Sequence, residues 1–194
     1  MGELSHFALR AGALALSIPL GQGGSYRHAS DDPQTLAALA QAFDDDHVAT
    51  VLPPDGGLLS GLSAGANLAL ALSNGITPAQ AGPLDQALSE ALLQAGMPAQ
   101  RVAALHRLLP ADLSPLERWT LGWVVAYLRG AQLLVLDRPF MPMNHAQQHQ
   151  VLALEAMFRT RHPHTPVVWL HLTEPIPMPA PALGAQPQER VCLC

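Results

Sequence analysis

The 194-residue sequence contains no lysine, so all ten of its basic residues are arginines. Chemistry that depends on a lysine ammonium is therefore excluded, including the phosphate-binding lysine of P-loop enzymes and Schiff-base catalysis. The net charge is −5, and the arginines are scattered along the chain rather than gathered into a basic stripe. Nucleic-acid binding uses such a stripe to neutralise phosphates, so we expect no nucleic-acid partner.

Cysteine is scarce as well, because the chain has two, Cys192 and Cys194, both at its C-terminal end. They cannot build a disulfide framework, which favours a cytosolic protein. Residues 11–20 resemble the apolar core of a signal peptide, but Glu3 lies where basic residues belong and no small-x-small cleavage site follows. No apolar run approaches the roughly 20 residues that a membrane-spanning helix needs.

Apolar residues make up 49% of the chain, which is typical of one folded domain with a substantial core. Short apolar stretches bounded by turns predict strands at 7–10, 13–18 and 47–52. We interpret the glycine-rich loop at 21–24 as a flexible turn. Residues 32–43 are predicted to form a helix, with Asp31 or Asp32 as its cap and Pro33 in its first turn.

A helix-rich stretch follows, with helices predicted at 64–72, 84–95, 99–108 and 114–129. The fully apolar runs 133–136 and 167–170 are typical of strands buried on both faces of a sheet. Between them, Asn144 is expected to cap a helix that ends near Arg161. This order predicts an α/β layered fold with a mainly parallel sheet and a helical subdomain at about 62–130. We place a single domain at 1–175 and an irregular, proline-rich tail at 176–194.

Residues 113–140 read LSPLERWTLGWVVAYLRGAQLLVLDRPF and resemble the passage from the signature helix to the Walker B strand of ABC transporter ATPases. Leu113 and Ser114 match the opening of an LSGGQ-type motif, and Asp137 and Pro139 match the end of the Walker B strand. His171 follows the next apolar run and resembles the switch histidine of the family. Upstream, residues 55–72 are most similar to the ATPase subunits of MCE-type lipid transporters. The resemblance covers most of 7–175 and implies a P-loop-NTPase-like fold.

The resemblance also locates the phosphate-binding loop, where this sequence departs from the family. With Thr35 aligned near the start of the family's helix, the lysine position falls on Pro33 and the next position on Gln34. Pro33 offers neither charge nor an N–H group. Asp31 and Asp32 bring negative charge to the place where a phosphate would sit, so we interpret them as an ordinary helix cap.

Two further motifs of the family are altered. The position of the Q-loop glutamine is Pro54, which has no donor to orient a metal ion or a water. In the signature motif Ser114 is kept, but Pro115, Leu116 and Glu117 replace Gly-Gly-Gln. Ser-x-x-Glu is a capping box, so Ser114 and Glu117 are expected to bond to one another rather than to contact a nucleotide.

The end of the Walker B strand keeps Asp137, which would be able to hold magnesium through water. The family's catalytic glutamate is replaced by Arg138, whose guanidinium cannot act as a general base near neutral pH. We expect Arg138 to pair with Asp137 or with an acidic group of a partner. Without a γ-phosphate to sense, His171 is interpreted as a hydrogen-bonded histidine at a strand end.

Two other kinds of site have partial support in the sequence. His145 and His149 are four residues apart on a predicted helix, but no Cys-x-x-Cys or His-Glu-x-x-His pattern accompanies them, so we predict no metal site. Weak nucleotide binding through Arg27 or Arg138 is an alternative, because arginine binds phosphate well. The negative charge at the predicted helix cap and the missing glycine loop oppose it.

The resemblance therefore implies a non-catalytic ABC-type subunit that needs neither ATP nor magnesium. Such a subunit would lie on the cytoplasmic face of the inner membrane, on a transporter that handles lipids. Its partner would be a membrane permease, a catalytic ABC ATPase or both, and dimerisation stays open. Leu58, Leu59 and Leu62, in a loop interrupted by glycine, are candidate apolar docking residues. A free-standing adaptor that kept the fold and left transport is the alternative.

Overall fold

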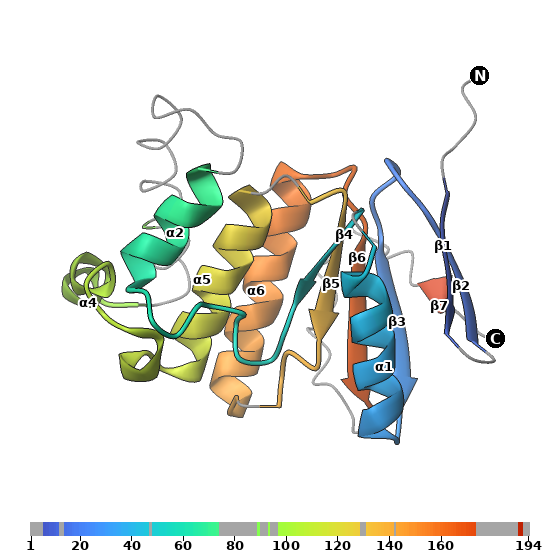
Figure 1. The fold of residues 1–194 in the computed structure, drawn as a ribbon, viewed down its shortest axis with the longest axis horizontal. Helices are drawn as coiled ribbons and strands as arrows, with labels where there is room; N and C mark the ends of the chain where they lie inside the picture. The colour runs from blue at the N-terminus through green and yellow to red at the C-terminus, as the bar shows by residue number, and fades with distance from the viewer. Residues whose placement is uncertain are drawn as a thin grey trace, which may run out of the picture.

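The computed structural model describes residues 6–11, 14–46, 48–73, 89, 93, 97–128, 131–141, 143–173 and 190–191. Figure 1 shows the arrangement of their helices and strands. In chain order these are β1 (His6–Ala11), β2 (Leu14–Pro19), β3 (Ser25–Ser30), α1 (Pro33–Asp44), β4 (Ala49–Leu52), α2 (Ala64–Ser73), α4 (Ala99–Leu105), the short 3-10 helix η1 (Pro110–Asp112), α5 (Pro115–Leu128), β5 (Leu133–Asp137), α6 (His145–Arg161), β6 (Val167–Leu172) and β7 (Arg190–Val191).

A parallel sheet forms the centre of the fold and has the strand order β4-β5-β6-β3-β7. Every strand pair in it is parallel. A separate antiparallel hairpin of β1 and β2 lies beside it (Figure 1), and α1 packs against both the sheet and this hairpin. The prediction of an α/β fold with a mainly parallel sheet is confirmed.

The central strands are buried on both faces, as their continuous apolar runs predict. All five residues of β5 are buried. Leu133, Val135, Val168 and Leu170 point toward α1 and the hairpin. The alternate residues of these strands point the other way, where α5 and α6 cover the sheet with a cluster that includes Trp119, Trp123, Phe158 and Trp169.

The helical stretch forms a smaller core of its own. Ala64 and Leu68 of α2, Val102 and Leu105 of α4, and Leu121 and Val124 of α5 make up most of this cluster. The predicted helices at 64–72 and 114–129 match α2 and α5 closely. The predicted helix at 99–108 ends earlier, at Leu105, because the carbonyls of the next residues turn to accept bonds from the start of α2. The predicted helix at 84–95 lies outside the described residues apart from positions 89 and 93.

Strand β3 was not predicted from the sequence. Its residues, SYRHAS, carry little apolar character, and Tyr26 is its one buried member. The strand nevertheless lies inside the sheet, between β6 and β7, and pairs along its whole length with β6. Hydrophobic periodicity did not reveal this strand because it has too few apolar residues. It is a strand because segments distant in sequence complete its backbone hydrogen bonds.

Two other expectations need correction. The tail at 176–194 was predicted to be irregular, but Arg190–Val191 form β7, which pairs with β3; the rest of the tail lies outside the described residues. The loop at 21–24 is more tightly packed than a flexible turn. The Gly23 N–H donates to the His164 carbonyl at 2.9 Å, and a Cβ on Gly23 would lie 1.9 Å from the Pro163 carbonyl oxygen.

Among the described residues, none of the helices combines the length and apolar character required to span a bilayer.

Candidate functional site

The candidate site lies at the carboxyl ends of the parallel strands, along the lower edge of the sheet in Figure 1. Open parallel sheets bind ligands at this edge, where loops and helix N-termini converge. Here β3 leads into α1, β4 leads into the loop that starts at Pro53, and β5 ends at Asp137. His171 is the penultimate residue of β6 and pairs with Ala29 of β3. The fold thus brings four of the sequence-predicted regions to one edge.

The N-terminus of α1 is closed by its own cap. The connection from β3 to α1 has two residues, Asp31 and Asp32. The Asp32 carboxylate accepts from the N–H groups of Gln34 and Thr35 at 2.9 and 3.1 Å and from the Thr35 hydroxyl at 2.6 Å. These bonds, the one from the Thr35 hydroxyl first, hold the pKa of Asp32 below its usual value. Of the two predicted caps, Asp31 and Asp32, the structure has Asp32, and the placement of Pro33 in the first turn is confirmed.

Asp137, at the end of β5, is paired with the residue that follows it. Arg138 donates from Nε to Asp137 Oδ1 at 2.7 Å and from Nη2 to Oδ2 at 2.9 Å. This two-bond fork covers both oxygens of a carboxylate that is itself buried. The bonds to Asp137 raise the pKa of the Arg138 guanidinium. Of the two pairings expected for Arg138, the structure contains the one with Asp137.

The backbone of Arg138 is unusual. Its φ is +44°, and among the described residues it is the one non-glycine residue with a positive φ. Its N–H donates to the Leu170 carbonyl at 2.8 Å, and its carbonyl accepts from Met141 N–H at 3.1 Å. A left-handed conformation is costly for a residue with a side chain, and it persists where surrounding bonds fix it.

His171 is half-buried, and its Nδ1 lies 2.9 Å from the Leu172 carbonyl oxygen. A carbonyl accepts only, so this nitrogen carries the proton. Burial lowers the pKa of His171. The prediction of a hydrogen-bonded histidine near a strand end is confirmed, although β6 continues one residue further, to Leu172.

The loop after β4 crosses α5 at very short range. Gly56 has φ +86°, and its carbonyl oxygen would lie 2.0 Å from a Cβ added to Gly122 of α5. The Asp55 carboxylate accepts from Gly57 N–H at 3.0 Å and shapes the turn. Pro54, which the resemblance assigns to the Q-loop position, is half-buried and lies within the turn that the Gly56 N–H closes on the Pro53 carbonyl at 3.0 Å. Glycine is therefore needed at position 56 for the positive φ and at position 122 for the close approach of the loop to α5.

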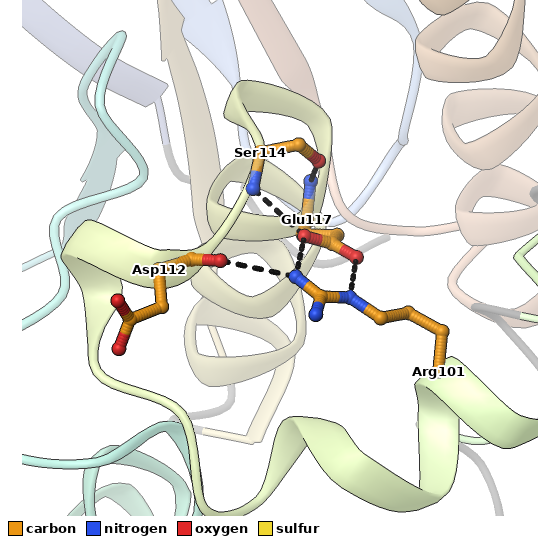
Figure 2. Close-up of polar contacts among 4 residues, drawn as sticks. All are labelled: Arg101, Asp112, Ser114 and Glu117. Atoms are coloured by element: carbon orange, nitrogen blue, oxygen red, sulfur yellow. Dashed lines mark hydrogen bonds and ion pairs between the residues drawn. The ribbon is translucent and has the colours of Figure 1, made fainter.

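The N-terminus of α5 has the predicted capping box of Ser114 and Glu117, and Arg101 also bonds to it (Figure 2). Ser114 N–H donates to Glu117 Oε2 at 2.7 Å, and Glu117 N–H donates to Ser114 Oγ at 3.3 Å. Arg101 of α4 donates to both oxygens of the same carboxylate, at 2.7 and 3.0 Å, and to the Asp112 carbonyl at 3.0 Å. Glu117 is buried, and these bonds, those from Arg101 first, lower its pKa.

Arg101 is a site residue that the sequence did not reveal. It lies 16 positions before Glu117, in another helix, so no local spacing rule relates the two. The sequence shows only a glutamate at the third position of a helix. Its burial, which creates the need for a cationic or hydrogen-bonding partner, is a property of the folded chain.

The three candidate docking leucines differ in exposure. Leu58 packs against the helical core, Leu62 is half-buried, and Leu59 is 53% exposed. The buried side chain of Asn67 fixes the loop that carries them: its Oδ1 accepts from Leu59 N–H at 2.8 Å, and its Nδ2 donates to the Leu59 and Leu62 carbonyls at 3.2 and 3.1 Å. Leu59 is therefore an apolar side chain presented to solvent on a fixed backbone.

The remaining candidates lie apart from this edge or are exposed. Within the described part of the chain, no three histidine, cysteine or carboxylate side chains are placed to hold a metal ion. His145 is exposed and His149 is exposed on the same helix, α6. The guanidinium carbon of Arg27, on β3, lies 6.0 Å from the centre of the Trp169 ring.

Solved structures of ATP-binding cassettes share this fold. The ATP-binding cassette MJ0796, as a dimer in a post-hydrolysis state with ADP and phosphate, matches with a TM-score of 0.59 and 10% identity over 86% of this chain and 84% of that one. cbiO1 from Clostridium perfringens, part of the ABC transporter complex cbiONQ, matches with a TM-score of 0.61 and 13% identity over 87% and 77%. The ATP-binding subunit of an ABC transporter gives 0.61 and 13% over 88% and 78%.

No protein-family model matches the sequence, and no curated protein matches it. At these low identities the structural matches establish the fold, which is that of the ABC ATPases, a P-loop-NTPase-like α/β fold. The predicted fold class is confirmed, and the function depends on the residues at the edge of the sheet.

Proposed function

We propose that this chain is a non-catalytic subunit with an ABC ATPase fold, bound at the cytoplasmic face of a membrane transporter that handles lipids. The observation that carries the proposal is that internal bonds occupy the groups that would hold a nucleotide. The Asp32 carboxylate accepts from the N–H groups at the start of α1. Glu117 accepts from Arg101 and from the Ser114 N–H at the start of α5. Arg138 donates to the Asp137 carboxylate.

The chemistry of the residues supports the same conclusion. P-loop NTPases cradle phosphates with a glycine-rich backbone and a lysine, and they hold Mg²⁺ with a P-loop hydroxyl and the Walker B aspartate. Here the connection from β3 to α1 has two residues, the chain has no lysine, and the Thr35 hydroxyl donates to Asp32. The residues present therefore do not fit a magnesium–nucleotide complex.

The proposal is tested by calorimetry with ATP and ADP, in the presence of magnesium, up to millimolar ligand. We expect no binding heat and no rise in unfolding temperature, because a bound ligand would stabilise the chain according to its concentration and affinity. A known ATP-binding cassette measured in parallel is the positive control. Binding at tens of micromolar would contradict the proposal and would favour phosphate binding through Arg27 or Arg138.

The partner in this proposal is a permease that docks on the loop carrying Leu59. The similarity of residues 55–72 to ATPase subunits of MCE-type transporters supports a lipid-related complex. Since its backbone is fixed by Asn67, Leu59 would lose little conformational freedom on binding, which favours an interface contact.

A Leu59→Asp variant is expected to fold with unchanged stability, within about 0.5 kcal/mol, because the side chain is largely exposed. It is also expected to lose most recovery of the permease in a pulldown from native membranes. Met141→Asp is the matched control, since Met141 is 60% exposed on the connection between β5 and α6. Equal recovery with Leu59→Asp would exclude this loop as the docking surface. If the wild-type chain recovered no transporter subunit, the result would contradict the transport proposal and favour the free-standing adaptor.

A further inference from the structure

Arg118, in the first turn of α5, has a guanidinium for which the described part of the chain supplies no counter-charge. The residue is half-buried. Its Nη1 donates to the Pro110 carbonyl at 3.3 Å, while its Nε is buried without a hydrogen-bond partner. Among the described residues no carboxylate forms a salt bridge with Arg118, although Arg101 and Arg138 each have one. An unpaired, half-buried guanidinium is a group that a carboxylate from another molecule would stabilise.

Two surface loops meet at Arg118. The loop after β4 lies over its backbone, since a Cβ on Gly56 would lie 2.3 Å from the Arg118 carbonyl oxygen. The segment after α4 meets its side chain through the Pro110 carbonyl. The far end of the first loop is joined to the second where the Ala64 N–H donates to the Leu108 carbonyl at 2.8 Å. Arg118 therefore lies at the junction of the two loops.

Each of the two loops presents an exposed leucine. Leu59 is 53% exposed, and Leu109 is 44% exposed. Asn67 bonds to the N–H and the carbonyl of Leu59, and Leu109 lies between Leu108 and Pro110, whose carbonyls both accept hydrogen bonds. The two loops thus combine a cation with two apolar side chains on a fixed backbone, and such side chains lose little conformational freedom on binding.

The charges near Arg118 favour a protein carboxylate over an anionic membrane. Asp55 and Asp112 are exposed in the same two loops, against one further exposed cation, Arg107, and the chain carries a net charge of −5. An anionic lipid surface attracts clusters of basic residues, and the two aspartates oppose it. A single carboxylate can form a two-bond fork with one guanidinium. The surface therefore fits a protein segment with one acidic side chain among apolar ones.

We propose, on the basis of the proposed function, that the permease docks here through an apolar segment that bears one aspartate or glutamate. Its carboxylate pairs with the Arg118 guanidinium, and its apolar side chains pack on Leu59 and Leu109. The interface shields this ion pair from water, which strengthens it and penalises any segment that lacks the carboxylate. Arg118 thus sets which segment binds, and the two leucines supply apolar contact.

The absence of lysine makes this contact directly measurable. Arg118→Lys keeps the positive charge and introduces a lysine into a chain that has none. A water-soluble carbodiimide joins a lysine amine to a carboxylate that touches it, and takes up the water released as the amide forms. In native membranes we expect a product in which the introduced lysine is linked to an aspartate or glutamate of a transporter subunit, identified by mass spectrometry of the linked peptides. Arg161→Lys, exposed at the end of α6, is the matched control and is expected to give no such product.

Pulldowns from the same membranes separate the charge of Arg118 from its structural role. Arg118→Gln and Arg118→Lys both remove the guanidinium that bonds to the Pro110 carbonyl, but Arg118→Lys alone keeps the charge. Arg118→Gln is expected to recover about tenfold less permease than the wild type, and Arg118→Lys to retain most of the recovery. Equal losses in the two variants would show a structural role and overturn the proposed ion pair. Unfolding temperatures measured in parallel establish that each variant is folded.

Failure of the acidic contact is distinguishable from failure of the proposed function. If the wild-type chain recovers a transporter subunit, but Arg118→Gln recovers as much or the introduced lysine is linked to no subunit, the acidic contact alone is rejected. If the wild-type chain recovers no transporter subunit, both are rejected. Binding of the wild-type chain to phosphatidylglycerol vesicles that is lost in Arg118→Gln would show that this surface binds lipid headgroups, and it would overturn the acidic segment.

Discussion

A Gly122→Ala variant is expected to be less stable than the wild-type chain by about 2 kcal/mol, which corresponds to an unfolding temperature about 4–8 °C lower. A Cβ at this position would lie 2.0 Å from the Gly56 carbonyl oxygen and 2.7 Å from Leu52 Cδ1. Neither neighbour can yield easily, because Gly56 is backbone in a turn with positive φ and Leu52 is a fully buried residue of β4. The loop after β4 would have to move away from α5.

Helix propensity predicts the opposite sign. Alanine is favoured over glycine inside a helix by about 1 kcal/mol, and Gly122 is in the middle of α5. The measured sign therefore tells which effect is larger at this crossing. Gly122→Val should be worse than Gly122→Ala, since a β-branched side chain adds volume to the same contact.

Gly61→Ala is the matched control for this experiment, because nothing lies within 4 Å of a Cβ at Gly61 and its φ is not left-handed. It should change the free energy of unfolding by less than about 0.5 kcal/mol in urea denaturation. A stabilised Gly122→Ala chain would mean that the loop at Gly56 is free to shift, and that the close crossing is not a constraint on the fold.

Replacing Glu117 is the second large effect. Glu117→Ala is expected to cost about 2 kcal/mol at pH 7, because it removes the return bond of the capping box and leaves Arg101 without its carboxylate. The expected cost is smaller than that of breaking a fully buried ion pair, because Arg101 is 38% exposed and water replaces part of what it loses.

Glu117→Gln separates the cap from the charge. A glutamine at the third position of a capping box still accepts from the Ser114 N–H, so this variant keeps the cap and loses the ion pair. It is expected to lie between the wild type and Glu117→Ala in chemical denaturation at pH 7. If the two variants were equally unstable, the ion pair with Arg101 rather than the box would hold the start of α5.

The ion pair should also appear in the pH dependence of stability. The pKa of Glu117 is lowered in the folded chain from an unfolded value of 4.5, chiefly by Arg101. The folded state therefore favours the ionised form, so this contribution is complete above the unfolded pKa and is lost as the pH falls through the folded pKa. The stability difference between wild type and Glu117→Gln should be full at about pH 6–7 and shrink below about pH 4.5. A constant difference across this range would reject the ionic contribution.

The features of this protein that follow from local rules could be predicted from its sequence. Continuous apolar runs identified β5 and β6 as strands buried on both faces. The spacing of Ser114 and Glu117 predicted their reciprocal bonds, and the Asp-Pro sequence at 32–33 predicted the start of α1. The absence of lysine and the arginine after Asp137 are matters of composition and order, and both support the proposal of a non-catalytic subunit.

Features that depend on segments distant in sequence could not be predicted from the sequence and were revealed only by the tertiary structure. β3 has too little apolar character to be recognised, and it is a strand because β6 and β7 pair with its backbone. Arg101 belongs to the site because α4 packs where its guanidinium reaches Glu117, and Gly122 matters because the loop at Gly56 crosses α5 there. Backbone pairing, ion pairs between helices and close crossings are set by the packing of the whole chain, and no local pattern of residues encodes them.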